Sequence, residues 1–122
     1  MRKTQLKRTG IGVVVFTAGV VLLMSVIRAA VFSAEAAGVE DGAALFENKG
    51  CAQCHYTDST ETKIGPGLEG LFARDRLPVS GRPVTSENIR RQLQNPYDAM
   101  PSFADRLTED QTAHLVVYLK SL

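Results

Sequence analysis

The stretch that decides the fold is Cys51-Ala52-Gln53-Cys54-His55. Two thiols separated by two residues and followed directly by an imidazole form the pattern in which both thiols add to the vinyl groups of one haem. A helical backbone spaces the two thiols to match the vinyl carbons, and the adjacent histidine is then aimed at the iron from the same face. We therefore predict covalent haem attachment at Cys51 and Cys54, with His55 as an axial iron ligand.

Two other readings of the cysteine pair have less support. A zinc site needs four ligands, and beyond Cys51 and Cys54 the chain offers only the neighbouring His55 and the remote His114. A thioredoxin-like redox pair needs a strand, a turn and a helix around it, whereas the flanking sequence here predicts helices. A purely structural C-x-x-C-H is the third alternative.

The sequence on both sides of this stretch predicts an all-α domain. Apolar residues recur at helical spacing in residues 42–50, 86–94 and 107–122. The last of these helices has a capping box, with Thr108 as N-cap and Gln111 three residues on. Three short helices suit a small domain that is held together by a large buried cofactor.

The amino-terminal third has the pattern of an export or membrane segment. Residues 1–34 hold five basic side chains and no acidic one, and the apolar run 11–27 has no charge. The order "basic, then apolar" is typical of a signal peptide or a membrane anchor. We expect an anchor or signal segment at residues 1–28, a linker at 29–39, and one globular domain at 40–122 on the outer side of the cytoplasmic membrane.

Retention and cleavage of this segment are both compatible with its sequence. Seventeen nearly all-apolar residues span roughly 26 Å as a helix, slightly short of a bilayer core, and adding residues 29–34 makes the span long enough. Ala34-Glu35-Ala36 has the small-x-small form that a signal peptidase accepts, but it lies well beyond the apolar run. We predict a retained transmembrane helix, with a soluble periplasmic form, cleaved near Ala36, as the alternative.

Charge excludes one class of partner. Residues 35–122 hold nine basic and thirteen acidic side chains, a formal charge of −4. Nucleic-acid binding needs clustered positive charge, so we predict no nucleic-acid partner. A mildly acidic domain instead suits a basic protein partner.

From Gly42 to Leu122 the chain resembles the class I c-type cytochromes, of the mitochondrial type but with shortened loops, as in small bacterial members. The resemblance rests on residues 42–51, 63–74, 95–103 and 107–122. It implies the cytochrome c fold, with three or four helices wrapped around one covalent haem c. The family's tryptophan at the inner propionate is absent, because this chain has no Trp, and residues 75–85 match nothing securely.

The resemblance also implies roles for three residues outside C-x-x-C-H. The carbonyl of Pro66 would accept a hydrogen bond from the ring of the axial histidine, His55. Arg74 would lie near a haem propionate, and Met100 would be the sixth iron ligand.

The sixth ligand has competitors within the chain. Met24 lies in the apolar amino-terminal run and cannot reach the iron, and His114 lies in the last predicted helix. Met100 lies in a loop between Pro96 and Pro101, from which its side chain would project inward. We predict His55 and Met100 as the metal ligands, with His114 or an open position as alternatives.

A haem iron with histidine and methionine ligands binds neither oxygen nor peroxide, so the resemblance implies an electron carrier and no enzyme. We expect redox protein partners and no small-molecule substrate. The donor would be a quinol-oxidising complex, and the acceptor an oxidase, a reductase or a photosynthetic centre. The alternatives are a fixed haem subunit of a larger dehydrogenase or oxidase, and a ligand-binding haem enzyme or sensor.

We expect the protein to stay in the membrane fraction after alkaline carbonate washing, because the apolar segment is long and the Ala-x-Ala sequence is distant from it. Sequencing of the mature amino terminus tests this expectation. A soluble protein that starts near Ala37 would decide for cleavage.

Overall fold

The computed structural model describes the backbone of residues 8–122 and the side chains of residues 20–28 and 36–122. The chain forms two compact units, Met1–Ala34 and Glu35–Leu122. The helices are α1 (Arg8–Asn48), the 3₁₀ helices η1 (Cys51–Gln53) and η2 (Leu71–Ala73), α2 (Ser86–Gln94) and α3 (Glu109–Lys120). The described residues form no strand beyond an isolated bridge between Arg76 and Pro83, which confirms the predicted all-α class.

The predicted transmembrane helix is not found within the described part of the chain. There, no helix is long and apolar enough to cross a membrane. The described side chains of this first unit, residues 20–28, are all exposed. The basic residues Arg2, Lys3 and Lys7 lie outside the described residues.

The first helix is continuous where the sequence predicted two separate helices. We expected a transmembrane helix in residues 1–28 and a second helix from Gly42, but α1 runs from Arg8 to Asn48 and includes the segment predicted as a linker. That segment, residues 29–39, is rich in alanine and lacks proline. Alanine has the highest helix propensity of all residues, so the backbone stays helical where the apolar pattern ends.

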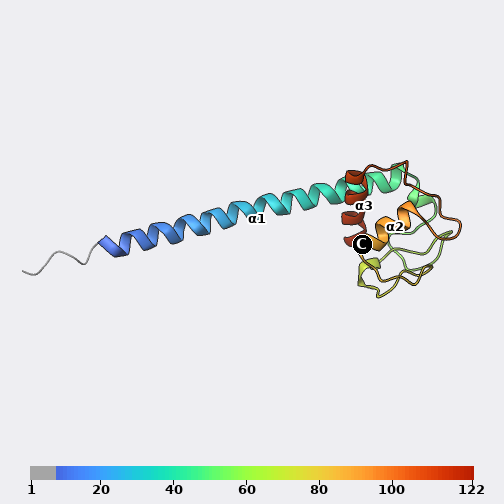
Figure 1. The fold of residues 1–122 in the computed structure, drawn as a ribbon, viewed down its shortest axis with the longest axis horizontal. Coiled ribbons are helices and arrows are strands. Elements are labelled where there is room, and N and C mark those ends of the chain that lie inside the picture. The colour runs from blue at the N-terminus through green and yellow to red at the C-terminus, as the bar shows by residue number, and fades with distance from the viewer. Residues whose placement is uncertain (1–7) are drawn as a thin grey trace, which may run out of the picture. The chain divides into compact units, whose positions relative to one another are not determined.

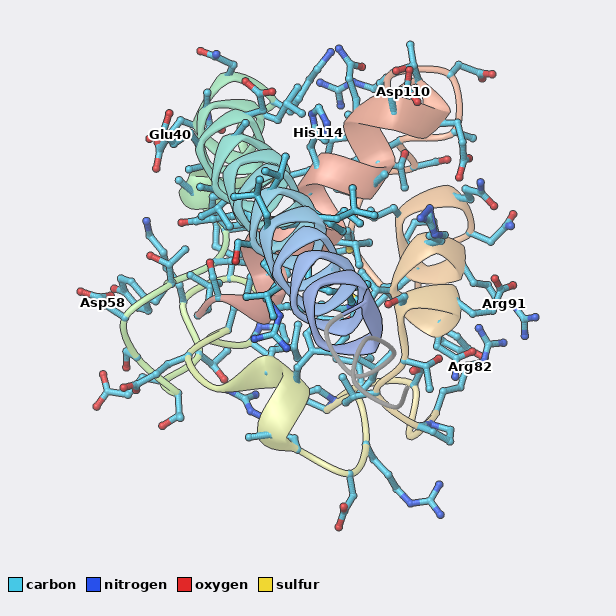
Figure 2. The ribbon with its side chains drawn as sticks, turned by 90° about the vertical axis from the view of Figure 1, so that its left-hand side faces the viewer. Glu40, Asp58, Arg82, Arg91, Asp110 and His114 are labelled. Atoms are coloured by element: carbon cyan, nitrogen blue, oxygen red, sulfur yellow. The ribbon has the colours of Figure 1, made fainter. Side chains whose placement is uncertain are left out.

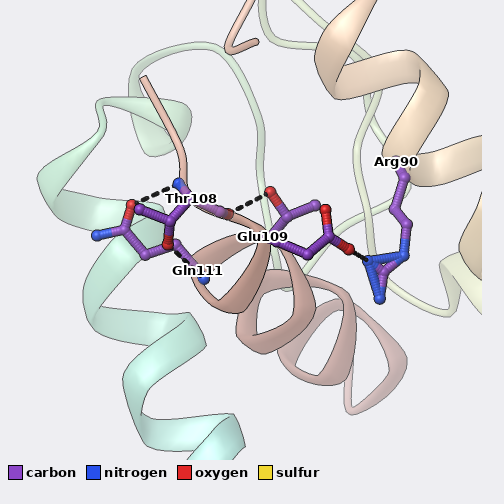
Figure 3. Close-up of polar contacts among 5 residues, drawn as sticks. Arg90, Thr108, Glu109 and Gln111 are labelled. Atoms are coloured by element: carbon purple, nitrogen blue, oxygen red, sulfur yellow. Dashed lines mark hydrogen bonds and ion pairs between the residues drawn. The ribbon is translucent and has the colours of Figure 1, made fainter. Parts of the chain in front are cut away.

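Helices α2 and α3 begin and end where local sequence signals place them. The side chain of Thr85 caps α2 by accepting a hydrogen bond from the backbone N–H of Asn88, at 3.1 Å. Figure 3 shows the predicted capping box of α3, in which the N–H of Gln111 donates to Thr108 Oγ1 and the N–H of Thr108 donates to Gln111 Oε1. An ion pair of 2.9 Å between Arg90 and Glu109 joins the two helices.

The core of the second unit lies where α2, α3 and the end of α1 meet (Figure 1). Burying the apolar side chains of such a core is the main force that holds a small domain together. The buried apolar residues are Phe46, Leu71, Leu77, Ile89, Leu93, Phe103, Leu115, Val116 and Leu119.

The end of α1 crosses α3 at a glycine. A Cβ atom added at Gly42 would collide with the backbone oxygen of His114 and with the side chain of Tyr118. One turn further on, the rings of Phe46 and Tyr118 meet edge to face, with centroids 5.7 Å apart. The close approach of the two backbones therefore requires glycine at position 42.

Gly42→Ala should lower the free energy of unfolding by about 1–3 kcal/mol, because the added methyl group overpacks the crossing. Gly38→Ala is the matched control, one turn earlier on α1, where an added Cβ would lie 3.5 Å from Val117, an ordinary contact distance. It should be neutral or stabilise by about 0.5–1 kcal/mol through helix propensity. Urea unfolding of both variants measures the difference in the free energy of unfolding. Equal free energies for the two variants would contradict the requirement for glycine at position 42.

Candidate haem site

The predicted attachment segment is a tight helical turn that directly follows α1. Gly50 has a φ of 81°, which ends α1 and turns the chain into η1. The N–H groups of Cys54 and His55 both donate to the carbonyl of Cys51, at 3.1 and 3.0 Å. The two free thiols and the imidazole are thus held together on one turn, and both cysteines are half-buried.

The ring of His55 is held in one orientation by the loop that follows it. Its Nδ1 lies 2.8 Å from the carbonyl oxygen of Pro66, the contact that the resemblance implied. A carbonyl only accepts, so Nδ1 carries the proton and Nε2 keeps its lone pair for a metal. Hydrogen bonds of this kind fix the tautomer and the direction of a ligating histidine.

The same loop also packs against His55 through backbone hydrogen bonds and through a glycine. Sequence reasoning missed both features. The N–H groups of Ile64 and Gly65 donate to the carbonyl of Cys54, at 3.2 and 2.8 Å. A Cβ atom at Gly65 would collide with the His55 ring, so only glycine fits there. The sequence did contain a signal for this close approach, because Gly65 directly precedes Pro66, the predicted hydrogen-bond acceptor.

Met100 is half-buried at the edge of the core, and its sulfur has a polar neighbour. The side-chain N–H of Gln92 donates to Met100 Sδ at 3.6 Å. Gln92 lies on α2, one residue before the buried Leu93. Sequence reasoning missed Gln92, because a helical glutamine next to a core position is ordinarily a solvated residue.

Arg74 holds the loop that contains Pro66. One guanidinium nitrogen donates to the carbonyls of Gly67 and Glu69, at 2.9 and 2.6 Å. The structure therefore shows a bracing role for Arg74, while its predicted contact with a propionate stays a prediction.

His114, the alternative ligand, lies at the surface where α3 crosses α1. Its Nδ1 is 3.5 Å from a carboxylate oxygen of Asp41, and its side chain is 40% exposed. Figure 2 shows it between α3 and the end of α1. This position suits a surface ion pair.

Burial raises the pKa of the Cys51 thiol above its ordinary value of 9.0, and the nearby Arg106 charge opposes this effect only in part. A raised pKa keeps Cys51 a thiol at neutral pH. Because the thiolate is the reactive form, the thiol is also protected from oxidation. That is the form from which a thioether can be built.

The chemistry of this donor set fits haem c. Two thiols at C-x-x-C spacing suit the two vinyl groups, His55 offers a directed imidazole nitrogen, and Met100 offers a thioether. The described residues hold no group of three or more His, Cys, Asp and Glu side chains that could bind a bare metal ion. The four ligands of a zinc site are therefore not found among them.

Comparison with known proteins agrees with this site. The family model "Cytochrome c" matches residues 39–122. Cytochrome c 2.1 of Caenorhabditis elegans is 32% identical over 96 residues, which cover 66% of this chain and 86% of the relative. Cytochrome c-551 of Pseudomonas aeruginosa is 24% identical over 99 residues, which cover 81% of this chain and 93% of the relative.

The matched residues include the attachment turn, the loop against His55, both short helices and the Met100 loop. The family implies one covalently attached haem c and electron transfer by that haem. This chain belongs to the cytochrome c family, as a class I monohaem member.

Proposed function

We propose that Cys51 and Cys54 hold the haem c of this domain, that His55 and Met100 ligate its iron, and that the domain carries one electron at a time between redox proteins. The observation that carries the proposal is the 2.8 Å contact between His55 Nδ1 and the Pro66 carbonyl. It leaves Nε2 as the free ring nitrogen, on the turn that also presents both thiols.

The residues of the chain set what this site does. Bound haem iron supplies a one-electron Fe(III)/Fe(II) couple. The loop against His55 holds the imidazole still, so little reorganisation accompanies a change of charge. The thioether of Met100 favours the reduced state, and the Gln92 N–H draws electron density from the same sulfur and strengthens that preference. With both axial positions filled by side chains, the protein is a carrier and no enzyme.

The proposed setting is the outer side of the cytoplasmic membrane. The basic and apolar order of residues 1–27 supports export, and retention of that segment as an anchor is our proposal from sequence. There the domain would take electrons from a quinol-oxidising complex and pass them to an oxidase, a reductase or a photosynthetic centre. A fixed subunit of a larger complex is the second candidate, and stable co-purification with a partner would favour it.

The division into an anchor or signal at 1–28, a linker at 29–39 and a haem domain at 40–122 is proposed in the same way. Arg74 is proposed near a propionate, in addition to its observed bonds to the Pro66 loop.

Acidified acetone should leave the haem on the protein, because two thioether bonds hold it at Cys51 and Cys54. Cys51→Ser and Cys54→Ser should each lower the yield of mature haem protein strongly, measured as haem absorbance per polypeptide. Ser59→Ala, a hydroxyl change outside the attachment turn, is the control and should mature normally. Release of the wild-type haem into the acetone would overturn covalent attachment.

Met100→Ala should abolish the weak near-infrared sulfur-to-iron band of the oxidised protein and open a site for carbon monoxide. The potential should fall by on the order of 0.1 V, within the roughly 0.8 V that axial ligands span.

Gln92→Leu should keep the near-infrared band, and it should lower the potential by less than Met100→Ala does. The bond is worth about 0.5–1.5 kcal/mol, and about 1.4 kcal/mol corresponds to 59 mV for one electron, so the fall should be below roughly 60 mV.

His114→Ala is the control for both variants and should change neither the band nor the potential. If His114→Ala removed a ligand while Met100→Ala left the spectrum intact, the protein would be a bis-histidine cytochrome. Carbon monoxide binding to the reduced wild type would instead favour a ligand-binding haem enzyme or sensor.

A further inference from the structure

The loop that carries Met100, residues 96–101, is fixed at both of its ends. Before it, the N–H of Asn95 donates to a carbonyl in the last turn of α2 at 2.7 Å, and after it, the N–H of Phe103 donates to the carbonyl of Leu93 at 2.8 Å. Between these ends, residues 96–101 make no backbone–backbone hydrogen bond within the described part of the chain. The conformation of the loop therefore depends on contacts of its side chains.

One residue of this loop also has a strained backbone. Asp98 has a φ of 58°, in the left-handed region, and is the one non-glycine residue with a positive φ among those that the structure describes. Such a conformation costs free energy, although aspartate tolerates it better than most residues, and it persists only where its surroundings hold it. The loop conformation that packs Met100 against the core therefore needs support from outside the loop.

Arg82 supplies that support through Tyr97. The guanidinium of Arg82 donates to the hydroxyl of Tyr97 at 3.2 Å, and its carbon lies 5.1 Å from the centre of the same ring. A guanidinium so close to an aromatic ring adds a cation–π attraction to the hydrogen bond. The Tyr97 side chain is 43% exposed, so burial alone does not hold it in place.

The position of Arg82 is fixed by a tight turn at residues 75–84, a stretch to which the sequence resemblance gave no role. The N–H of Leu77 donates to the carbonyl of Arg82 at 2.8 Å, and the N–H of Val84 donates to the carbonyl of Asp75 at 3.2 Å. Leu77 is buried in the core. The guanidinium thus extends from an anchored backbone to a loop that has few bonds of its own.

The two loops that flank the predicted iron site are therefore held differently. Backbone bonds from Ile64 and Gly65 tie the loop against His55, whereas the Met100 loop is held by the side chains of Gln92 and Tyr97. Local opening is easiest where few bonds must break. The Met100 side is accordingly the side on which the site opens.

We propose that Arg82 and Tyr97 are positioning residues for Met100, because their contact keeps the loop of residues 96–101 in the conformation that holds the thioether on the iron. The proposal rests on the proposed function, since it needs Met100 as an iron ligand. Loss of the contact shifts the loop toward an open form, in which the sixth position accepts a small external ligand.

Imidazole binding to the oxidised full-length haem protein measures the open fraction. The Fe–S bond must break before an Fe–N bond to imidazole can form, with no change of oxidation state. The apparent dissociation constant is therefore the intrinsic constant divided by the fraction of protein in the open form. Loss of the near-infrared sulfur-to-iron band during an imidazole titration gives that constant.

Arg82→Gln and Tyr97→Leu should each tighten apparent imidazole binding by roughly three- to tenfold, as expected for one partly exposed hydrogen bond and cation–π contact. Tyr97→Phe keeps the ring and should have a smaller effect. The double variant Arg82→Gln/Tyr97→Leu should bind imidazole about as tightly as either single variant, because both changes remove the same contact.

Arg91→Gln is the matched control and should keep the wild-type constant. It also removes one arginine charge, but Arg91 lies on α2 and pairs with Glu87 on the same helix (Figure 2). Tyr97→Leu changes no charge, so its agreement with Arg82→Gln separates the contact from a general effect of charge.

Full additivity of the two single variants, or an effect of Tyr97→Leu no larger than that of Arg91→Gln, would overturn the proposal. Either result would leave the wild-type band and its loss in Met100→Ala intact, so the proposed function would stand. A wild type without the band, or a Met100→Ala variant that binds imidazole no more tightly than the wild type, would refute Met100 as a ligand. That result would overturn the proposed ligand set together with this inference.

Discussion

The hydrogen bond between His55 Nδ1 and the Pro66 carbonyl is the constraint on which the rest of the site depends. It links the attachment turn to the loop after it, and the bonds from Ile64 and Gly65 to the Cys54 carbonyl tighten the same link. A free imidazole would have two tautomers and many orientations. The loop leaves the His55 ring one tautomer and one orientation. A metal ligand held in this way moves little when the charge on the metal changes.

The crossing of α1 and α3 supplies the rigid base for that link. Gly42 lets the backbones approach, and Phe46 packs on Tyr118 one turn later. Helix α1 ends at Asn48, just before the attachment turn that starts at Cys51. The crossing therefore also fixes the position of that turn. A cavity or an added methyl group at the crossing would therefore shift the attachment turn, although none of the residues at the crossing is a proposed haem ligand.

Charge shows how local geometry can oppose composition. Residues 35–122 have a formal charge of −4, yet Lys63 binds the carbonyl of Ala52 within the attachment turn, and Lys49 binds the carbonyl of Arg106. Net charge governs solubility, while the field within a few ångströms of the site governs encounter.

The sequence by itself determined the attachment motif, the all-α class, the bounds of α2 and the capping box of α3, because each is encoded by residues within one or two turns of each other. It predicted a linker at 29–39, where α1 is in fact continuous because alanine propensity outlasts the apolar pattern. Only the tertiary structure decided that Gln92 meets Met100, that Lys49 meets Arg106, and that Arg74 braces the Pro66 loop. Such contacts depend on how separate segments pack, and spacing along the chain does not encode which side chains then come within reach.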